Sequence, residues 1–139
     1  KCSNFIGEAL DMAAEYGFST VLLVGHVGKL VKLAGGIMNT HSRWADCRTE
    51  LICAHAAVCG AGRVLCQELM QATPTDACLE LLGKAGLQEQ VMDSLLAAIQ
   101  AHLERRAAGA YRVGAVLFSN EHGELGRTKE TEDLIHLWK

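Results

Sequence analysis

One short apolar segment constrains the fold of this chain more than any other feature. Residues 18–24, Phe-Ser-Thr-Val-Leu-Leu-Val, are rich in side chains that favour strands. Such a run predicts a strand covered on both faces, as in a parallel sheet. Residues 112–118 predict a second strand, and a polar turn containing Gly123 and Gly126 follows it. Two strands with a long stretch of other sequence between them indicate an α/β protein.

Helical patterns occupy most of the remaining sequence, with helices expected over residues 4–16, 29–34, 43–58, 74–83, 87–106 and 129–138, and a shorter one that follows Gly60 and Gly62 and ends near residue 71. The first of these helices carries apolar residues on one face, namely Phe5, Ala9, Met12 and Tyr16. The longest carries an apolar stripe made of Val91, Leu95, Ile99 and Leu103. Two strands cannot shield each other. We therefore predict an α/β fold with a small, mostly parallel sheet, flanked by several helices and completed by sequence outside this chain.

The length of the chain and its composition narrow the classes of protein. A chain of 139 residues suits a single α/β domain spanning residues 1–139. It starts at Lys1 rather than Met, and residues 2–10 resemble the inside of a domain, so we expect part of a longer protein. The net charge of −3 argues against a nucleic-acid partner. No apolar run approaches the roughly 18–20 residues of a membrane span.

Six cysteines occur without any Cys-x-x-Cys pair, which predicts reduced thiols in a cytoplasmic protein. The spacing of His55, Cys59 and Cys66 matches no familiar zinc-ligand pattern, so we predict no metal site. Gly28-Lys29 is similar to part of a nucleotide-binding P-loop. That loop requires glycine at position 23 and Ser or Thr at position 30, where this chain has leucine.

The segment over residues 24–55 contains the strongest indications of chemistry. Its strand runs through a glycine turn, Gly25 to Gly28, into a helix, and free backbone amides in such a turn bind anions. Lys29 and Lys32 are three residues apart and are expected on one side of that helix. No Asp or Glu lies between residues 16 and 45, a span that also holds His26, His41 and Arg43. An acidic protein with such a cationic span is suited to acidic substrates or phosphates.

Polar residues follow at unusual density, comprising Asn39, Thr40, His41, Ser42, Asp46, Arg48, Glu50 and His55. On a helix over residues 43–58, Asp46 and Glu50 would share one face, and Arg43 could pair with Asp46. A simpler interpretation stays open, in which Ser42 only caps this helix and His41 is an ordinary surface residue.

Residues 25–42, Gly-His-Val-Gly-Lys-Leu-Val-Lys-Leu-Ala-Gly-Gly-Ile-Met-Asn-Thr-His-Ser, resemble the signature of the cobalt-precorrin-5B C1-methyltransferase family, CbiD. Asp46, Arg48 and Glu50 continue the match, as do residues 3–8 and 116–120. Family members are considerably longer, so this chain would be their carboxy-terminal portion. The resemblance implies methyl transfer from S-adenosylmethionine to ring carbon C1 of a cobalt-containing tetrapyrrole, in anaerobic cobalamin biosynthesis. No residue is assigned to the methyl donor.

A corrin precursor carries many carboxylates, which the cationic span could bind by charge-assisted hydrogen bonds. The predicted substrate-binding residues are Gly25, His26, Gly28, Lys29, Lys32, Asn39, Thr40, Ser42, Arg43 and Arg48. His41 is the candidate to accept a proton, because histidine titrates near neutral pH, and Asp46 or Glu50 could orient it.

Two other functions remain open at this point. The chain could be a non-catalytic corrinoid-binding module, or a metal-dependent hydrolase that uses His41, Asp46 and His55. The expected partners are the tetrapyrrole and the missing amino-terminal domain of the same protein, with neither nucleic acid nor membrane. Homo-oligomer formation is left open.

Overall fold

A computed structural model describes residues 1–139 and contains one three-stranded sheet. The strands are β1 (Thr20–His26), β2 (Arg112–Ser119) and β3 (Gly123–Arg127), in the spatial order β1-β2-β3. β1 and β2 are parallel, whereas β2 and β3 form an antiparallel hairpin. The expected α/β fold with a small sheet flanked by helices is confirmed, and the sheet has one parallel and one antiparallel pair of strands.

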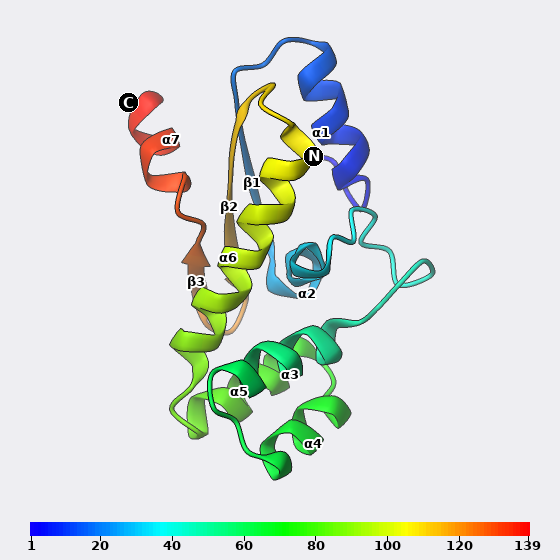
Figure 1. The fold of residues 1–139 in the computed structure, drawn as a ribbon, viewed down its shortest axis with the longest axis vertical. Coiled ribbons are helices and arrows are strands. Elements are labelled where there is room, and N and C mark those ends of the chain that lie inside the picture. Colours follow the sequence, from blue (N-terminus) through cyan, green and yellow to red (C-terminus); the bar gives the residue numbers. More distant parts are fainter.

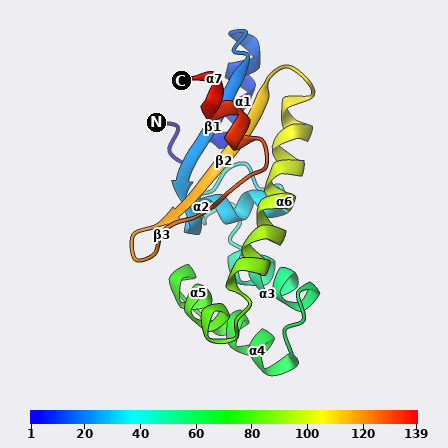
Figure 2. The same ribbon diagram turned by 90° about the vertical axis from the view of Figure 1, so that its left-hand side faces the viewer.

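Helices cover the two faces of this sheet. α1 (Ile6–Glu15) and the long α6 (Gln88–Ala107) lie on one face, and α7 (Thr131–Leu137) lies on the other (Figures 1 and 2). The stripe predicted for α6 is confirmed, since each of its four residues is at most 1% exposed. It packs on β2, where Gln100 also donates a hydrogen bond to the backbone oxygen of Val113 over 2.9 Å.

Three further helices form a layer at one end of the sheet (Figure 1). They are α3 (Arg48–Val58), α4 (Arg63–Gln71) and α5 (Thr75–Lys84), and they pack on one another and on the first part of α6. α3 was expected to start near residue 43. It begins five residues later because Cys47 adopts a left-handed conformation, with φ of 52°. Residues 43–47 are therefore irregular, which moves Asp46 off the helix.

The chain leaves β1 through α2 (Val27–Leu30), which continues as the 3₁₀ helix η1 (Val31–Gly35). Gly36 ends this helix in the left-handed conformation, with φ of 76°. Four consecutive residues of η1, from Val31 to Ala34, are buried. The α2–η1 segment thereby places the residues that follow it, 37–47, along the end of the sheet.

Two expectations about packing were wrong. The turn expected after β2 contains the strand β3. This strand was not predicted because its sequence, Gly-Glu-Leu-Gly-Arg, lacks β-branched residues. The apolar face expected to bury α1 is mostly exposed, and Ile6, Leu10 and Ala13 make the core contacts instead.

All six cysteines are free. None of the helices combines the length and the apolar character that crossing a membrane requires.

Candidate functional site

At the end of β1, the side chain of His26 binds a backbone amide of the turn into α2. The backbone of His26 is extended, and its Nδ1 accepts a hydrogen bond of 3.0 Å from the amide of Gly28. The expectation that the Gly28 amide is free to bind an anion is therefore wrong. Because Nδ1 accepts this bond, the neutral ring carries its proton on Nε2 and can donate there. The ring meets Phe118 edge to face, with centroids 6.0 Å apart.

Lys32 lies inside the protein rather than beside Lys29 on a cationic surface. Its side chain is 1% exposed, and its ammonium donates to the backbone oxygens of Thr40 and Ala45 at 2.9 and 3.0 Å. A longer bond of 3.4 Å reaches the hydroxyl of Ser42. Burial lowers the pKa of Lys32, and the nearby Asp46 carboxylate opposes that shift. With three donors and three protein acceptors, Lys32 holds the 40–45 loop in place.

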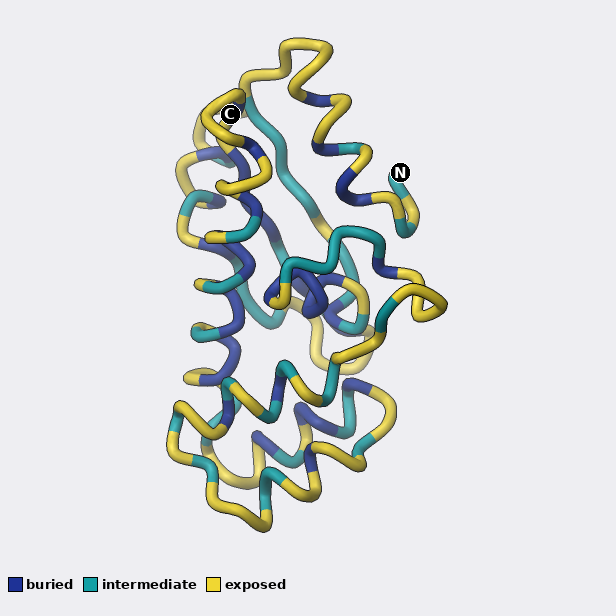
Figure 3. The backbone as a smooth tube through the Cα atoms, turned by 45° about the vertical axis from the view of Figure 1, so that its right-hand side comes forward, coloured by how far each residue is buried: buried dark blue, intermediate teal, exposed yellow.

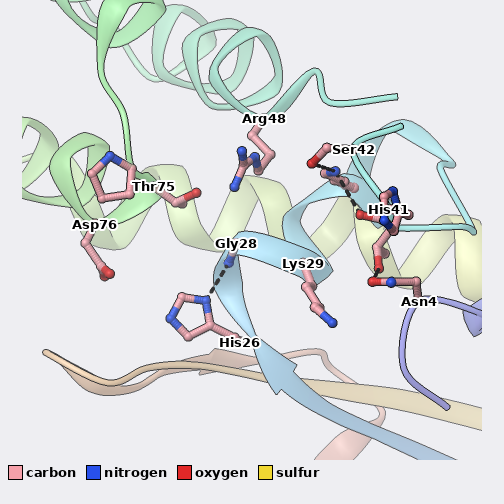
Figure 4. A pocket seen from close by; sticks show the side chains of 12 residues that line it. Asn4, His26, Gly28, Lys29, His41, Ser42, Arg48, Thr75 and Asp76 are labelled. Atoms are coloured by element: carbon pink, nitrogen blue, oxygen red, sulfur yellow. Dashed lines mark hydrogen bonds between the residues drawn. The ribbon is translucent and has the colours of Figure 1, made fainter. Parts of the chain in front are cut away.

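A polar pocket of about 430 Å³ opens where β1, α2, the 40–45 loop and the start of α5 meet (Figure 4). Apart from Gly28 and Pro74, every residue that borders it has a polar side chain. The lining residues are Asn4, His26, Gly28, Lys29, Lys32, Thr40, His41, Ser42, Arg48, Pro74, Thr75 and Asp76. Eight of the thirteen predicted site residues therefore meet in one place.

Positive charge outweighs negative charge around the polar pocket. Lys29 is exposed and makes no hydrogen bond or ion pair within the chain. Arg48 makes a two-pronged ion pair with Asp46, through Nε at 2.5 Å and Nη2 at 3.0 Å. The Arg48 guanidinium lowers the pKa of the Asp46 carboxyl. Asp76 is the only acid in the lining, so an anionic ligand is favoured.

His41 is held by its own loop. Its Nδ1 accepts a 3.1 Å hydrogen bond from the amide of Arg43, and its amide donates to the Asn39 side chain over 3.2 Å. Neither Asp46 nor Glu50 hydrogen-bonds to the ring, so the arrangement in which one of them orients His41 is absent. As with His26, the neutral ring presents an Nε2–H donor.

Five predicted residues lie outside the polar pocket. Gly25 borders a groove beside β1, and Asn39 supports the loop. The Cζ atom of Arg43 lies over the ring of Trp44, 5.7 Å from its centroid, and Arg43 does not pair with Asp46. Asp46 and Glu50 line a second cavity of about 160 Å³, which Arg48 also borders.

Four lining residues were missed from the sequence, namely Asn4, Pro74, Thr75 and Asp76. Asn4 reaches the pocket because its side-chain oxygen accepts from the Thr40 hydroxyl at 3.1 Å. Thr75 and Asp76 lie at the start of α5, and the sequence of residues 73–76 predicted only that a helix begins there. Oδ1 of Asp76 is buried and has no hydrogen-bond partner, which marks it as an unused acceptor.

One group of side chains has the composition and spacing of metal ligands. Asp76, Glu121 and His122 bring three ligand atoms within 4.8 Å of one another, and the latter two residues are exposed.

His55 does not join His41 at the pocket. Its Nδ1 lies 2.7 Å from the hydroxyl of Ser94 on α6, and burial lowers its pKa.

Comparison with known proteins gives a consistent result. The family model described as CbiD, C-terminal domain, matches residues 39–129. The chain is 46% identical over 125 residues to a cobalt-precorrin-5B C(1)-methyltransferase of Ruminiclostridium cellulolyticum, covering 90% of this chain and 33% of that protein. Proteins with the same name from Listeria monocytogenes serotype 4b and Alkaliphilus metalliredigens are 39% and 33% identical, covering 99% and 100% of this chain.

The chain spans about a third of the length of the curated relatives it matches, between 33% and 37% for these three. No solved structure matches it significantly. The family match covers the 40–47 loop, α3 and the start of α5, whereas Asn4, β1 and α2 lie before it.

Proposed function

Because this chain belongs to the CbiD family, we propose that the full-length protein is a cobalt-precorrin-5B C1-methyltransferase of anaerobic cobalamin biosynthesis, acting in the cytoplasm. S-adenosylmethionine would supply the methyl group, and cobalt would arrive as part of the tetrapyrrole substrate. The family match and the common name of the relatives support this proposal. The sequence outside this chain would complete the enzyme.

The polar pocket would hold the rim of the tetrapyrrole rather than its ring. Apart from Pro74, no apolar side chain lines the pocket, so it offers little to the flat face of a macrocycle. Acetate and propionate groups on the rim are anionic and need cationic donors. Lys29 and Arg48 supply charge, and His26 and His41 supply Nε2–H donors. Charge-assisted hydrogen bonds of this kind contribute about 1.5–3 kcal/mol each when shielded from water.

Methyl transfer forms a bond from ring carbon C1 to the methyl carbon as the bond from methyl to sulfur breaks, and a proton must later leave the macrocycle. We propose His41 as the acceptor of that proton. To accept at Nδ1, the ring must release the Arg43 amide, because this nitrogen already accepts its hydrogen bond. Asp76 is the competing acceptor, since its buried Oδ1 is unpartnered in the same pocket. His41→Asn and Asp76→Asn, compared in turnover and in substrate affinity, distinguish the two.

Mass spectrometry of the tetrapyrrole tests the reaction directly. Full-length enzyme is incubated with cobalt-precorrin-5B and with S-adenosylmethionine carrying a deuterated methyl group. We expect the product to gain one labelled methyl group. A product of unchanged mass, from protein that still binds the tetrapyrrole, would contradict the methyltransferase assignment.

A binding module is the second candidate function for this portion of the protein. It is favoured by the composition of the polar pocket, which suits carboxylates and has no apolar wall for an adenine ring. Calorimetry with the 139-residue chain separates the two possibilities. A module binds the tetrapyrrole and gives no heat with S-adenosylmethionine, whereas heat with the donor would place part of the donor site in this chain.

A further inference from the structure

β1 is an open edge of the sheet. It pairs with β2 on one side only, and its seven residues, Thr-Val-Leu-Leu-Val-Gly-His, include no lysine, proline or acid. Proteins usually protect an exposed edge strand with charges, proline or a bulge, because unpaired backbone groups recruit another strand. β1 is only half-buried along most of its length, and Val24 is 62% exposed, whereas β2 is mostly buried (Figure 3).

α1 has a second apolar face that is largely exposed in this chain. Phe5, Met12 and Tyr16 lie on it and are 55%, 50% and 73% exposed. Ala9, on the same face, borders a groove between α1 and the open edge of β1. Because Ile6, Leu10 and Ala13 already make the core contacts, this second face is free to cover a further element beside β1.

The groove between α1 and β1 has a volume of about 520 Å³, and most of its lining is apolar. Residues 22–26 of β1 form one wall, while Ile6 and Ala9 of α1 contribute to the other. Lys1, Cys2 and Ser3 also border the groove, and the amino-terminal end lies on the side of β1 away from β2 (Figure 2). Polypeptide joined to residue 1 therefore reaches the open edge without crossing the sheet.

The existing topology defines how a strand would enter. β1 connects to the parallel β2 by a right-handed crossover through α6, which is the rule for such connections. α1 lies on the same face as α6, and Arg106 of α6 forms a two-pronged ion pair with Asp11 of α1. A strand before α1, at the open edge and parallel to β1, would repeat this handedness. An antiparallel strand there would not form such a connection of two parallel strands through a helix.

We propose that in the full-length protein a strand from the polypeptide preceding residue 1 pairs in parallel with the open edge of β1 and packs beneath the second apolar face of α1. The relatives are about three times as long as this chain, and the matching family model is described as a carboxy-terminal domain, so they contain such polypeptide. The added strand would be apolar and about as long as β1. The proposal depends on family membership and not on the reaction.

Backbone geometry identifies the amides that test this pairing. Arg112 donates to the oxygen of Ser19, so odd-numbered residues of β1 face β2. The amides of Leu22 and Val24 therefore point to the open edge, whereas those of Val21 and Leu23 point to β2. We expect amide hydrogen exchange of the monomeric full-length protein, at single-residue resolution, to show that Leu22 and Val24 exchange at rates within about tenfold of those of Val21 and Leu23.

Exchange of Leu22 and Val24 about a hundredfold or more faster than Val21 and Leu23 would leave the edge open and overturn the proposal. Protection that is lost on dilution, as a dimer dissociates, would assign the edge to a second copy and equally overturn it. Because neither readout requires turnover, failure here is distinct from failure of the proposed reaction.

A pair of helical substitutions in the full-length protein gives an independent test. Met12→Lys places a charge on the second apolar face of α1, and Val58→Lys places one on a residue of α3 that is 83% exposed. We expect Met12→Lys to lower the Tm by a few degrees and Val58→Lys to change it by about a degree at most. Equal, small effects would show that the second face of α1 remains in solvent and contradict the proposed packing.

Discussion

Lys29 and Lys32 are three residues apart and chemically identical, yet the structure predicts that replacing Lys32 destabilises the protein and replacing Lys29 does not. Lys32→Met keeps most of the side-chain volume and removes the ammonium that holds Thr40 and Ala45. Two carbonyl oxygens then lose their donor, and each unsatisfied buried group costs about 1–3 kcal/mol. Relief of the buried charge offsets part of this loss. We expect a net loss of about 2–4 kcal/mol in the free energy of unfolding.

Such a loss is a large share of the 5–15 kcal/mol that typically stabilises a domain of this size. Lys29→Met removes an exposed ammonium that contacts no protein group, so its effect should stay within about 0.5 kcal/mol. Urea unfolding of both variants, followed by circular dichroism, measures the difference. A loss below about 1 kcal/mol for Lys32→Met, or equal losses for both, would refute the structural role of Lys32.

Three further predictions concern positions away from the polar pocket. Burial lowers the pKa of His55 from its usual value of 6.5, so the unfolded chain takes up a proton at a higher pH than the folded protein does. The free energy of unfolding, measured with urea, should therefore fall as the pH drops below about 6.5, and it should fall less in His55→Gln. Gly114→Ala would place a methyl group 2.6 Å from the Thr131 hydroxyl and should destabilise by about 1–3 kcal/mol in thermal unfolding. Arg106→Gln breaks the exposed pair with Asp11 and should change stability by at most about 1 kcal/mol.

The elements with strong periodicity could be predicted from the sequence. The stripe from Val91 to Leu103 follows from its spacing alone, because burial selects apolar residues at the helical period. The two parallel strands follow from their short apolar runs, although β1 is only half-buried along most of its length. The start of α3 could not be predicted, since it depends on the left-handed Cys47 and on a tertiary bond from Lys32 to Ala45. Local patterns contain no signal for either.

The polar pocket was predicted only in part, for a related reason. Residues of the segment 26–48 meet because they are close in sequence, and His26, Lys29 and His41 illustrate this. Asn4 and Asp76 arrive from other parts of the chain, and only the packed fold brings them there. The burial of Lys32 was missed because four consecutive residues of η1 are buried, which no helical period predicts. The backbone oxygens of Thr40 and Ala45 that accept from its ammonium also belong to a later loop.

We propose that the polar pocket binds carboxylates of the tetrapyrrole, and Lys29 is the cation there that has no hydrogen-bond or ion-pair partner within the chain. The most direct test is titration of the tetrapyrrole substrate into full-length protein carrying Lys29→Met, with the exposed Lys84→Met on α5 as the matched control. We predict about tenfold weaker binding for Lys29→Met, with a smaller salt dependence, and unchanged binding for Lys84→Met. Equal affinities for both variants and the unmodified protein would contradict the claim.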